Sequence, residues 1–224
     1  MSGLWLLFLD ELKHLMRVRF LVIIWASMLL LVPSMAFLYV GLENAIPFSF
    51  IITQLGMMSA LATGAVITST LINDINNKTL VPFLVRPISS YSILLSRLTA
   101  IVVSVFSVVL VSILITKIVF NLFSVELILD KPILFLLMAS FVQTIITASL
   151  GILLGTLASS PATGMGAFII FGIQSQVIVV LVMEKLPEWF GGKVHAPVIL
   201  VHIALFIMFI TLIWMSKILK NKIL

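Results

Sequence analysis

The chain has 224 residues, of which 62% are apolar and 9% carry a formal charge. Soluble globular domains keep about 25% of their residues charged, so this composition cannot cover a surface that faces water. The length holds roughly six or seven membrane-spanning helices with short connectors, which excludes a large soluble catalytic domain. The chain contains no cysteine, which excludes disulfides, thiol nucleophiles and thiolate metal sites.

The N-terminal segment, residues 1–19, predicts an amphipathic helix that lies in the plane of the membrane. Its apolar residues recur at helical spacing, with polar residues on the other face. Two roles fit such a helix: an anchor that orients the first span, or a contact surface for a cytoplasmic partner. The apolar set is Leu4, Trp5, Phe8, Leu9, Leu12, Leu15 and Met16, and the polar set is Asp10, Lys13, His14 and Arg17.

The rest of the chain, residues 20–224, predicts a transmembrane domain in which uncharged runs locate the spans. A charge at mid-membrane costs about 2.5–3.5 kcal/mol on the insertion scale, so spans lie between charges. The turn-forming residues 159–164 divide one run that is too long for a single crossing. Continuously apolar runs favour helices over barrel strands. We therefore predict an all-α integral membrane protein with six transmembrane helices, at about 20–40, 49–72, 96–116, 132–157, 164–183 and 198–216.

The basic residues predict the orientation of these spans. Nine of the 13 fall on one side of a six-span arrangement, in the N-terminal segment, the connector after the second span and the C-terminal tail. By the positive-inside rule, both termini are then cytoplasmic. The net charge of +5 thus follows from topology, and we expect no nucleic-acid partner.

The residues of common catalytic and metal sites are missing from the spans. The chain has no HExxH, GxSxG or P-loop motif, and no Asp or Glu lies inside a predicted span. His14 is predicted on the opposite side of the membrane from His195 and His202, so the three cannot share a metal. We expect no enzymatic activity, no metal site and no cofactor bound by this chain. The lack of titratable groups also argues against a proton relay.

Small and uncharged polar residues stand out inside the spans. Three glutamines near mid-span, Gln143, Gln174 and Gln176, either bond between helices or line a translocation path. Gln174 and Gln176 are two residues apart, so on a helix they point in different directions. Small residues every four positions allow close helix packing, within the chain or between two chains. These seams are Gly56, Ala60, Gly64 and Thr68, and Ala139, Gln143, Thr147, Gly151 and Gly155.

The longest cytoplasmic connector, residues 73–91, has the features of a folded segment. Thr79 is a suitable cap for a short helix, and Pro87 would end that helix. An apolar face on this helix would be pressed on the membrane or inserted into a groove of a partner. That face would consist of Leu80, Phe83 and Leu84.

With these features the sequence resembles the permease subunits of type-2 ATP-binding cassette (ABC) exporters. That family has an in-plane N-terminal helix, six spans with both ends inside, and a coupling loop after the second span. The loop typically contains an acidic residue, Gly-Thr-Leu, a Pro-Val-Ser-like step, Leu-Leu and a Lys. The matching residues here are Asp74, Thr79-Leu80, Pro87-Ile88-Ser89, Leu94-Leu95 and Arg97. This sequence departs from the family pattern at Lys78 in place of Gly, Val81 in place of a frequent Glu, and Arg97 in place of Lys.

The resemblance implies an export permease that moves a substrate by using ATP hydrolysis on a separate ATPase subunit, where ATP and Mg would bind. It also implies a second permease chain, identical or different, and location in the cell membrane, as in the cytoplasmic membrane of a prokaryote. Outer gate elements would fall at Trp189, Gly191 and Gly192, although Trp189 also suits interfacial anchoring. The implied ATPase contacts are Asp74, Lys78, Thr79, Leu80, Phe83, Leu84, Arg86, Pro87 and Ser89.

Two other functions fit the same sequence. A passive or secondary transporter would move its substrate without ATP, and a noncatalytic assembly subunit would copurify with other membrane enzymes. Uncharged spans weakly favour an apolar or amphipathic cargo over a bare ion, although backbone carbonyls can also bind an ion. An ATPase gene next to the gene for this chain would favour the export permease.

Overall fold

The computed structural model describes residues 3–17, 25–26, 29–30, 34, 48–80, 89–122, 133–189 and 196–223. In this part of the chain all regular secondary structure is α-helical. Five of the helices are long and apolar enough to cross a membrane, and the first predicted span, 20–40, falls almost entirely outside the described residues. The helices are α1 (Gly3–Arg17), α3 (Phe48–Asn76), α5 (Ser90–Leu122), α6 (Ile133–Leu157), α7 (Pro161–Trp189) and α8 (Ala196–Ile223).

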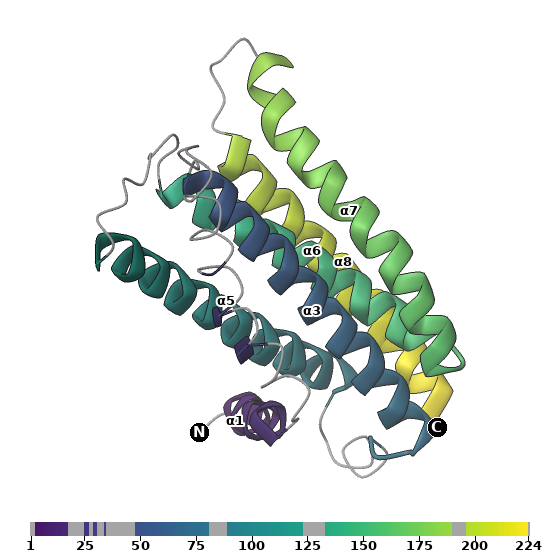
Figure 1. Cartoon of the computed structure of the whole chain (residues 1–224). Helices are drawn as coiled ribbons and strands as arrows, with labels where there is room; N and C mark the ends of the chain where they lie inside the picture. The colour runs from purple at the N-terminus through teal and green to yellow at the C-terminus, as the bar shows by residue number, and fades with distance from the viewer. Residues whose placement is uncertain are drawn as a thin grey trace.

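The long helices form a bundle with α6 near its centre (Figure 1). α6 packs against α3, α7 and α8, and α5 packs against α3 on the other side of the bundle. The shorter α1 lies crosswise against α5, near the end of the bundle where the C-terminus also lies. The chain is therefore an all-helical, multi-pass membrane protein in the part that the structure describes.

α3 and α6 run parallel to each other, and the two predicted seams of small residues form their contact. A Cβ atom added at Gly151 would lie 2.7 Å from the carbonyl oxygen of Gly64, so the two backbones are in direct contact. Farther along, the hydroxyl of Thr68 donates to the carbonyl of Gly151 at 3.3 Å. Close approach of this kind gives van der Waals contact that larger side chains would prevent. The two seams are therefore used within one chain.

Polar capping residues, as well as the edges of apolar runs, determine where the helices begin. Between α6 and α7, the hydroxyl of Ser160 accepts the backbone N–H of Thr163 at 3.3 Å, and Pro161 takes the first helical position, so the predicted break is confirmed. Ser89 does the same for α5, accepting the N–H of Ser92 at 3.1 Å. α5 thus begins at Ser90, earlier than the predicted 96, because its cap lies outside the apolar run.

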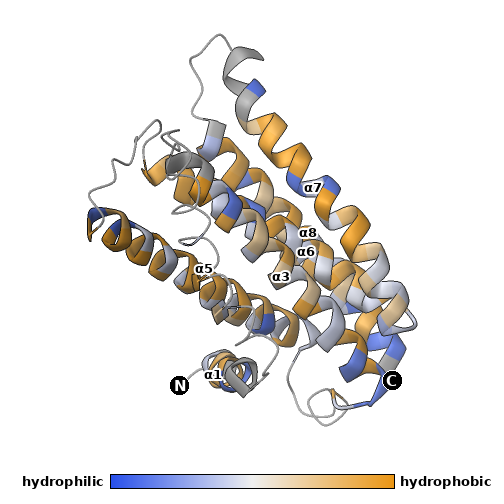
Figure 2. Ribbon diagram, in the orientation of Figure 1, coloured by the Kyte–Doolittle hydropathy of each residue, from blue (hydrophilic) through white to orange (hydrophobic). Residues whose placement is uncertain are grey.

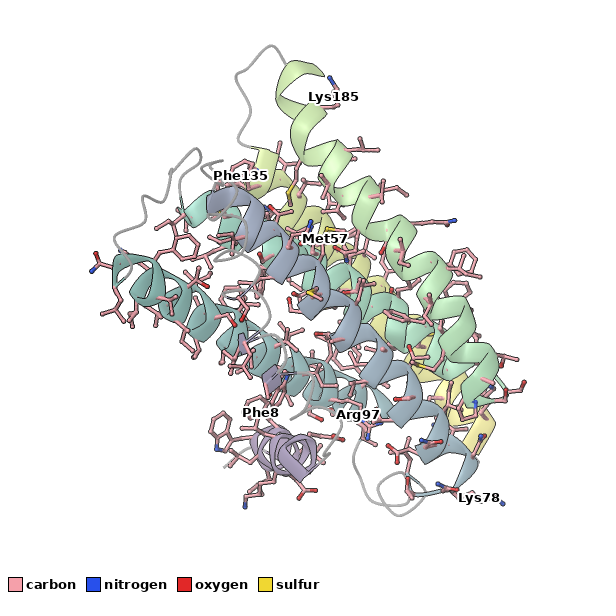
Figure 3. The ribbon with its side chains drawn as sticks, viewed as in Figure 1. Phe8, Met57, Lys78, Arg97, Phe135 and Lys185 are labelled. Carbon is pink, nitrogen blue, oxygen red and sulfur yellow. The ribbon has the colours of Figure 1, made fainter. Side chains whose placement is uncertain are left out.

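Hydrophilic residues are frequent at the end of the bundle near the C-terminus (Figure 2). Lys78 and Arg97 lie at this end and Lys185 at the other (Figure 3). The C-terminal ends of α6 and α8 meet at this end of the bundle, where the ammonium of Lys222 donates to the carbonyl of Thr156 at 2.7 Å. We call this the basic end, defined by Lys78, Arg97, Lys217, Lys220 and Lys222.

Candidate functional site

A buried group of charged side chains joins three helices at the basic end. Arg97 of α5 has only 6% of its side chain exposed. Its Nη2 atom lies 3.0 Å from Oε1 of Glu11 on α1 and 2.6 Å from Oδ2 of Asp74 on α3. Its Nε–H also donates to Oε1 of Glu11, at 3.2 Å. We call these three residues the Arg97 cluster.

The Arg97 cluster suits arginine because a guanidinium offers several donors in a fixed planar fork. One side of the fork holds Glu11, and Nη2 is shared with Asp74. Nη1 is buried and has no hydrogen-bond partner among the described residues. The cluster holds two negative charges and one positive charge, so removal of Arg97 would leave two carboxylates close together with no counter-ion.

Asp74 connects the Arg97 cluster to the end of α3. It lies in the last turn of α3, whereas the sequence had suggested a loop residue. Its Oδ1 atom accepts the hydroxyl hydrogen of Thr79 at 2.8 Å, while Oδ2 faces Arg97. A carboxylate at a helix C-terminus is unfavourable with respect to the helix dipole. The guanidinium of Arg97 offsets this repulsion.

The end of α3 is a Schellman motif, which fixes the direction in which the chain leaves the helix. The N–H of Thr79 donates to the carbonyl of Asp74 at 3.0 Å, and the N–H of Lys78 to the carbonyl of Ile75 at 3.2 Å. Lys78 has φ 56°, the left-handed conformation that this motif requires and that glycine adopts most easily. The Gly that is usual at this position in ABC export permeases would suit the same backbone.

The structure corrects the expectation that Leu80 contributes to an exposed apolar patch. Its side chain is 3% exposed and belongs to the core cluster that contains Leu94 and Leu98. Leu80 therefore anchors the beginning of the connector to the core of the bundle. The other predicted contacts in the connector, Phe83, Leu84, Arg86 and Pro87, lie outside the described residues, and Ser89 caps α5.

The three mid-span glutamines separate into a buried pair and one exposed residue. Gln143 and Gln176 are 1% and 0% exposed, and Nε2 of Gln176 donates to the backbone carbonyl of Gln143 at 3.5 Å. The Oε1 atom of Gln143 lies above Gly56, at 2.7 Å from a Cβ added there. This location favours helix packing over a path for these two residues. Gln174 is exposed, so Gln174 and Gln176 do point in different directions.

The predicted outer-gate residues fall at and after the end of α7. Trp189 is the last residue of α7, while its side chain, Gly191 and Gly192 lie outside the described part of the chain. Among the described residues, no three histidine, aspartate or glutamate side chains gather as metal ligands would. The best-defined candidate site is therefore the Arg97 cluster with the end of α3.

Sequence reasoning missed the role of Glu11, although a signal was present. On a helix, Glu11 falls three residues after Phe8 and four before Leu15, on the apolar face of the N-terminal segment. A carboxylate on an apolar face needs a partner when that face is buried. Arg97, inside the apolar beginning of α5, is the matching cation.

No protein-family model matches this chain, and no curated protein matches it in sequence. The class of protein rests on the fold: an all-helical, multi-pass membrane protein with a buried ion-pair cluster at its basic end.

Proposed function

We propose that this chain is the permease subunit of an ABC exporter, driven by ATP hydrolysis on a separate ATPase subunit. The observation that supports it most is the construction of the connector between α3 and α5. Both of its ends are fixed to the bundle, by the Schellman motif and Leu80 on one side and by Ser89 on the other. A segment that receives a mechanical input needs such rigid attachment.

The Arg97 cluster gives that connector a physical link to three helices. Asp74 lies four residues before the turn at Lys78, and Arg97 lies two turns after Ser89. Because Arg97 also holds Glu11, a displacement of the connector would move α1 together with α3 and α5. Ion pairs between packed helices are a means by which motion passes between sites.

In this proposal, Phe83 and Leu84 enter a groove on the ATPase, with Arg86 and Lys78 orienting the contact. Lys78 is exposed at the basic end. Burial of one large apolar side chain contributes about 1.5–3 kcal/mol, so a single residue can dominate assembly. Leu80 supports the connector from inside the core and takes no part in docking.

The test is copurification of the ATPase with the tagged chain from native membranes, identified by mass spectrometry. We expect Phe83→Asp to lower the recovered ATPase and the transport-coupled ATP hydrolysis by about tenfold or more, since it removes apolar contact and buries a charge. The matched control is Leu157→Asp, an exposed apolar residue at the end of α6 near Lys222.

The control should retain the ATPase at wild-type levels. If Phe83→Asp, inserted normally, also retains both the ATPase and coupled hydrolysis, the connector is not the coupling element. If the wild-type chain recovers no ATPase and supports flux without ATP, the chain is a passive or secondary transporter.

A further inference from the structure

The proposed function calls for a second permease chain, and the structure limits where that chain can bind. The seams of small residues that suit a helix interface are already used between α3 and α6. In the apolar span of α3, 61% of the residues are buried within the chain, whereas in the spans of α7 and α8 only 22% of the residues are buried. The surface available to a second chain thus includes α7 and α8.

A single polar group distinguishes α7 from the other exposed faces. Gln174 is exposed near the middle of the span Pro161–Met183, between the exposed apolar residues Phe171 and Ile178. A hydrophilic band midway along α7 is visible in Figure 2. No described residue forms a hydrogen bond with the Gln174 side chain. An amide without a partner in hydrocarbon costs several kcal/mol, so this position needs a partner other than the described residues.

The exposed faces of α5 and α8 do not have this need near mid-span. On α5 the exposed hydroxyl of Ser107 donates to the carbonyl of Val103 in its own helix, at 2.8 Å. On α8 the exposed residues near mid-span are apolar, including Phe206, Phe209 and Ile210, which suits contact with lipid. Gln54 on α3 is also exposed, but it lies at the beginning of the span Ile51–Asn76. Among the described residues, α7 therefore carries the exposed amide that lies near mid-membrane, where lipid cannot satisfy it.

We infer that the exposed face of α7, centred on Gln174, binds a second copy of this chain, and that the two Gln174 amides bond to each other. This inference rests on the proposed function, and it names the surface that the second permease chain occupies. A two-fold axis can bring a residue against its own copy. A primary amide is both donor and acceptor, so two copies are complementary.

Gly166 supports close approach on this face. A Cβ added there would have no atom within 4 Å, so the backbone of α7 is open to its surroundings about two turns from Gln174. In the seam, by contrast, the glycines contact a neighbouring helix of the same chain. An open glycine two turns from an unpaired amide on the same helix is an arrangement that suits the packing of a second helix.

The absence of native cysteine makes a direct test possible. Single-cysteine variants at Gln174 and at Val177, which leaves Gln174 intact, would be oxidised in native membranes with copper phenanthroline. We expect covalent dimers from both. Matched controls are Leu114→Cys on α5 and Phe206→Cys on α8, because both positions are exposed. These two variants should remain monomeric.

A second measurement isolates the amide. In phosphatidylcholine vesicles, Gln174→Leu should weaken dimerisation about 3- to 30-fold, the range for one interhelical hydrogen bond, and Gln174→Asn should weaken it less. Dimers linked through position 114 or 206 and not through 174 or 177 would overturn the inference, as would a monomeric wild-type chain.

Failure here and failure of the proposed function give different results. If the ATPase copurifies but oxidation at 174 and 177 yields no dimer, the interface is wrong and the export permease stands. If both positions form dimers but no ATPase is recovered, the interface stands and the export permease fails.

Discussion

The basic end and the middle of the bundle hold buried polar groups in different ways. At the basic end, Arg97 is paired with Glu11 and Asp74, whose side chains keep 17% and 22% of their surface exposed. In the middle, the buried amides of Gln143 and Gln176 are neutral, and their Oε1 atoms have no hydrogen-bond partner in the part of the chain that the structure describes. In the described helices, charge is placed where water can reach part of the site, and the buried polar groups at the depth where charge is most costly are uncharged.

The helix contacts differ in the same sense. The Arg97 cluster joins helices through ion pairs between long side chains, while the middle joins α3 to α6 through glycine backbones in direct contact. An ion pair between flexible side chains keeps two helices linked while they shift, whereas a glycine seam allows little movement before atoms collide. We therefore expect the middle to be the rigid part and the basic end the part that transmits motion.

The largest expected effect is the loss of Arg97. Arg97→Leu should lower the free energy of unfolding by about 3–5 kcal/mol, because it leaves Glu11 and Asp74 close together with no counter-ion. Arg97→Lys should restore part of the loss, since an ammonium keeps the charge but not the fork. Thermal unfolding in detergent, followed by circular dichroism, measures both.

A neighbouring pair of acidic residues provides the control. Glu11→Gln should be clearly destabilising, whereas Asp10→Asn, on the same helix but exposed, should be nearly neutral. Equal effects of the two substitutions would mean that the ion pair contributes nothing specific. An Arg97→Leu variant as stable as the wild-type chain would contradict the view that ion pairs hold the basic end together.

The next effect concerns the seam. Gly151→Ala should destabilise by about 1–3 kcal/mol, because the added Cβ meets the carbonyl oxygen of Gly64 at 2.7 Å and the helices must separate. The same substitution at Gly166, where no described atom of this chain lies within 4 Å, should leave the stability of the monomeric chain in detergent unchanged or raise it by about 0.5–1 kcal/mol through helix propensity. Parallel thermal unfolding of the two variants compares them directly. A neutral Gly151→Ala would show that α3 and α6 are not in backbone contact.

The smallest effect lies at the end of α3. Lys78→Gly should stabilise the chain by about 0.5–1 kcal/mol, because φ 56° is strained for lysine and free for glycine. Asn77→Gly, one residue earlier and without a positive φ, should destabilise slightly. If Lys78→Gly also destabilises, the ammonium of Lys78 has a role that outweighs the strain.

Part of this architecture could be predicted from the sequence because it depends on local composition. The apolar runs predict long helices, and residues 159–164 predict the break between α6 and α7, since serine caps and proline act within a few residues. The basic residues at the ends of α3 and α8 and near the beginning of α5 likewise follow from composition. The expected coupling contacts at Phe83, Leu84, Arg86 and Pro87 stay predictions of the sequence.

Only the tertiary structure decided which residues meet. Glu11 and Arg97 are 86 positions apart, and no local pattern pairs them. Periodicity marked both seams of small residues but left open whether they serve one chain or two, and the parallel packing of α3 on α6 decided this. Periodicity also could not predict that Leu80 enters the core, or that Gln176 is buried while Gln174 is exposed. The bilayer selects each helix by its own composition, whereas these contacts depend on how separate helices pack together.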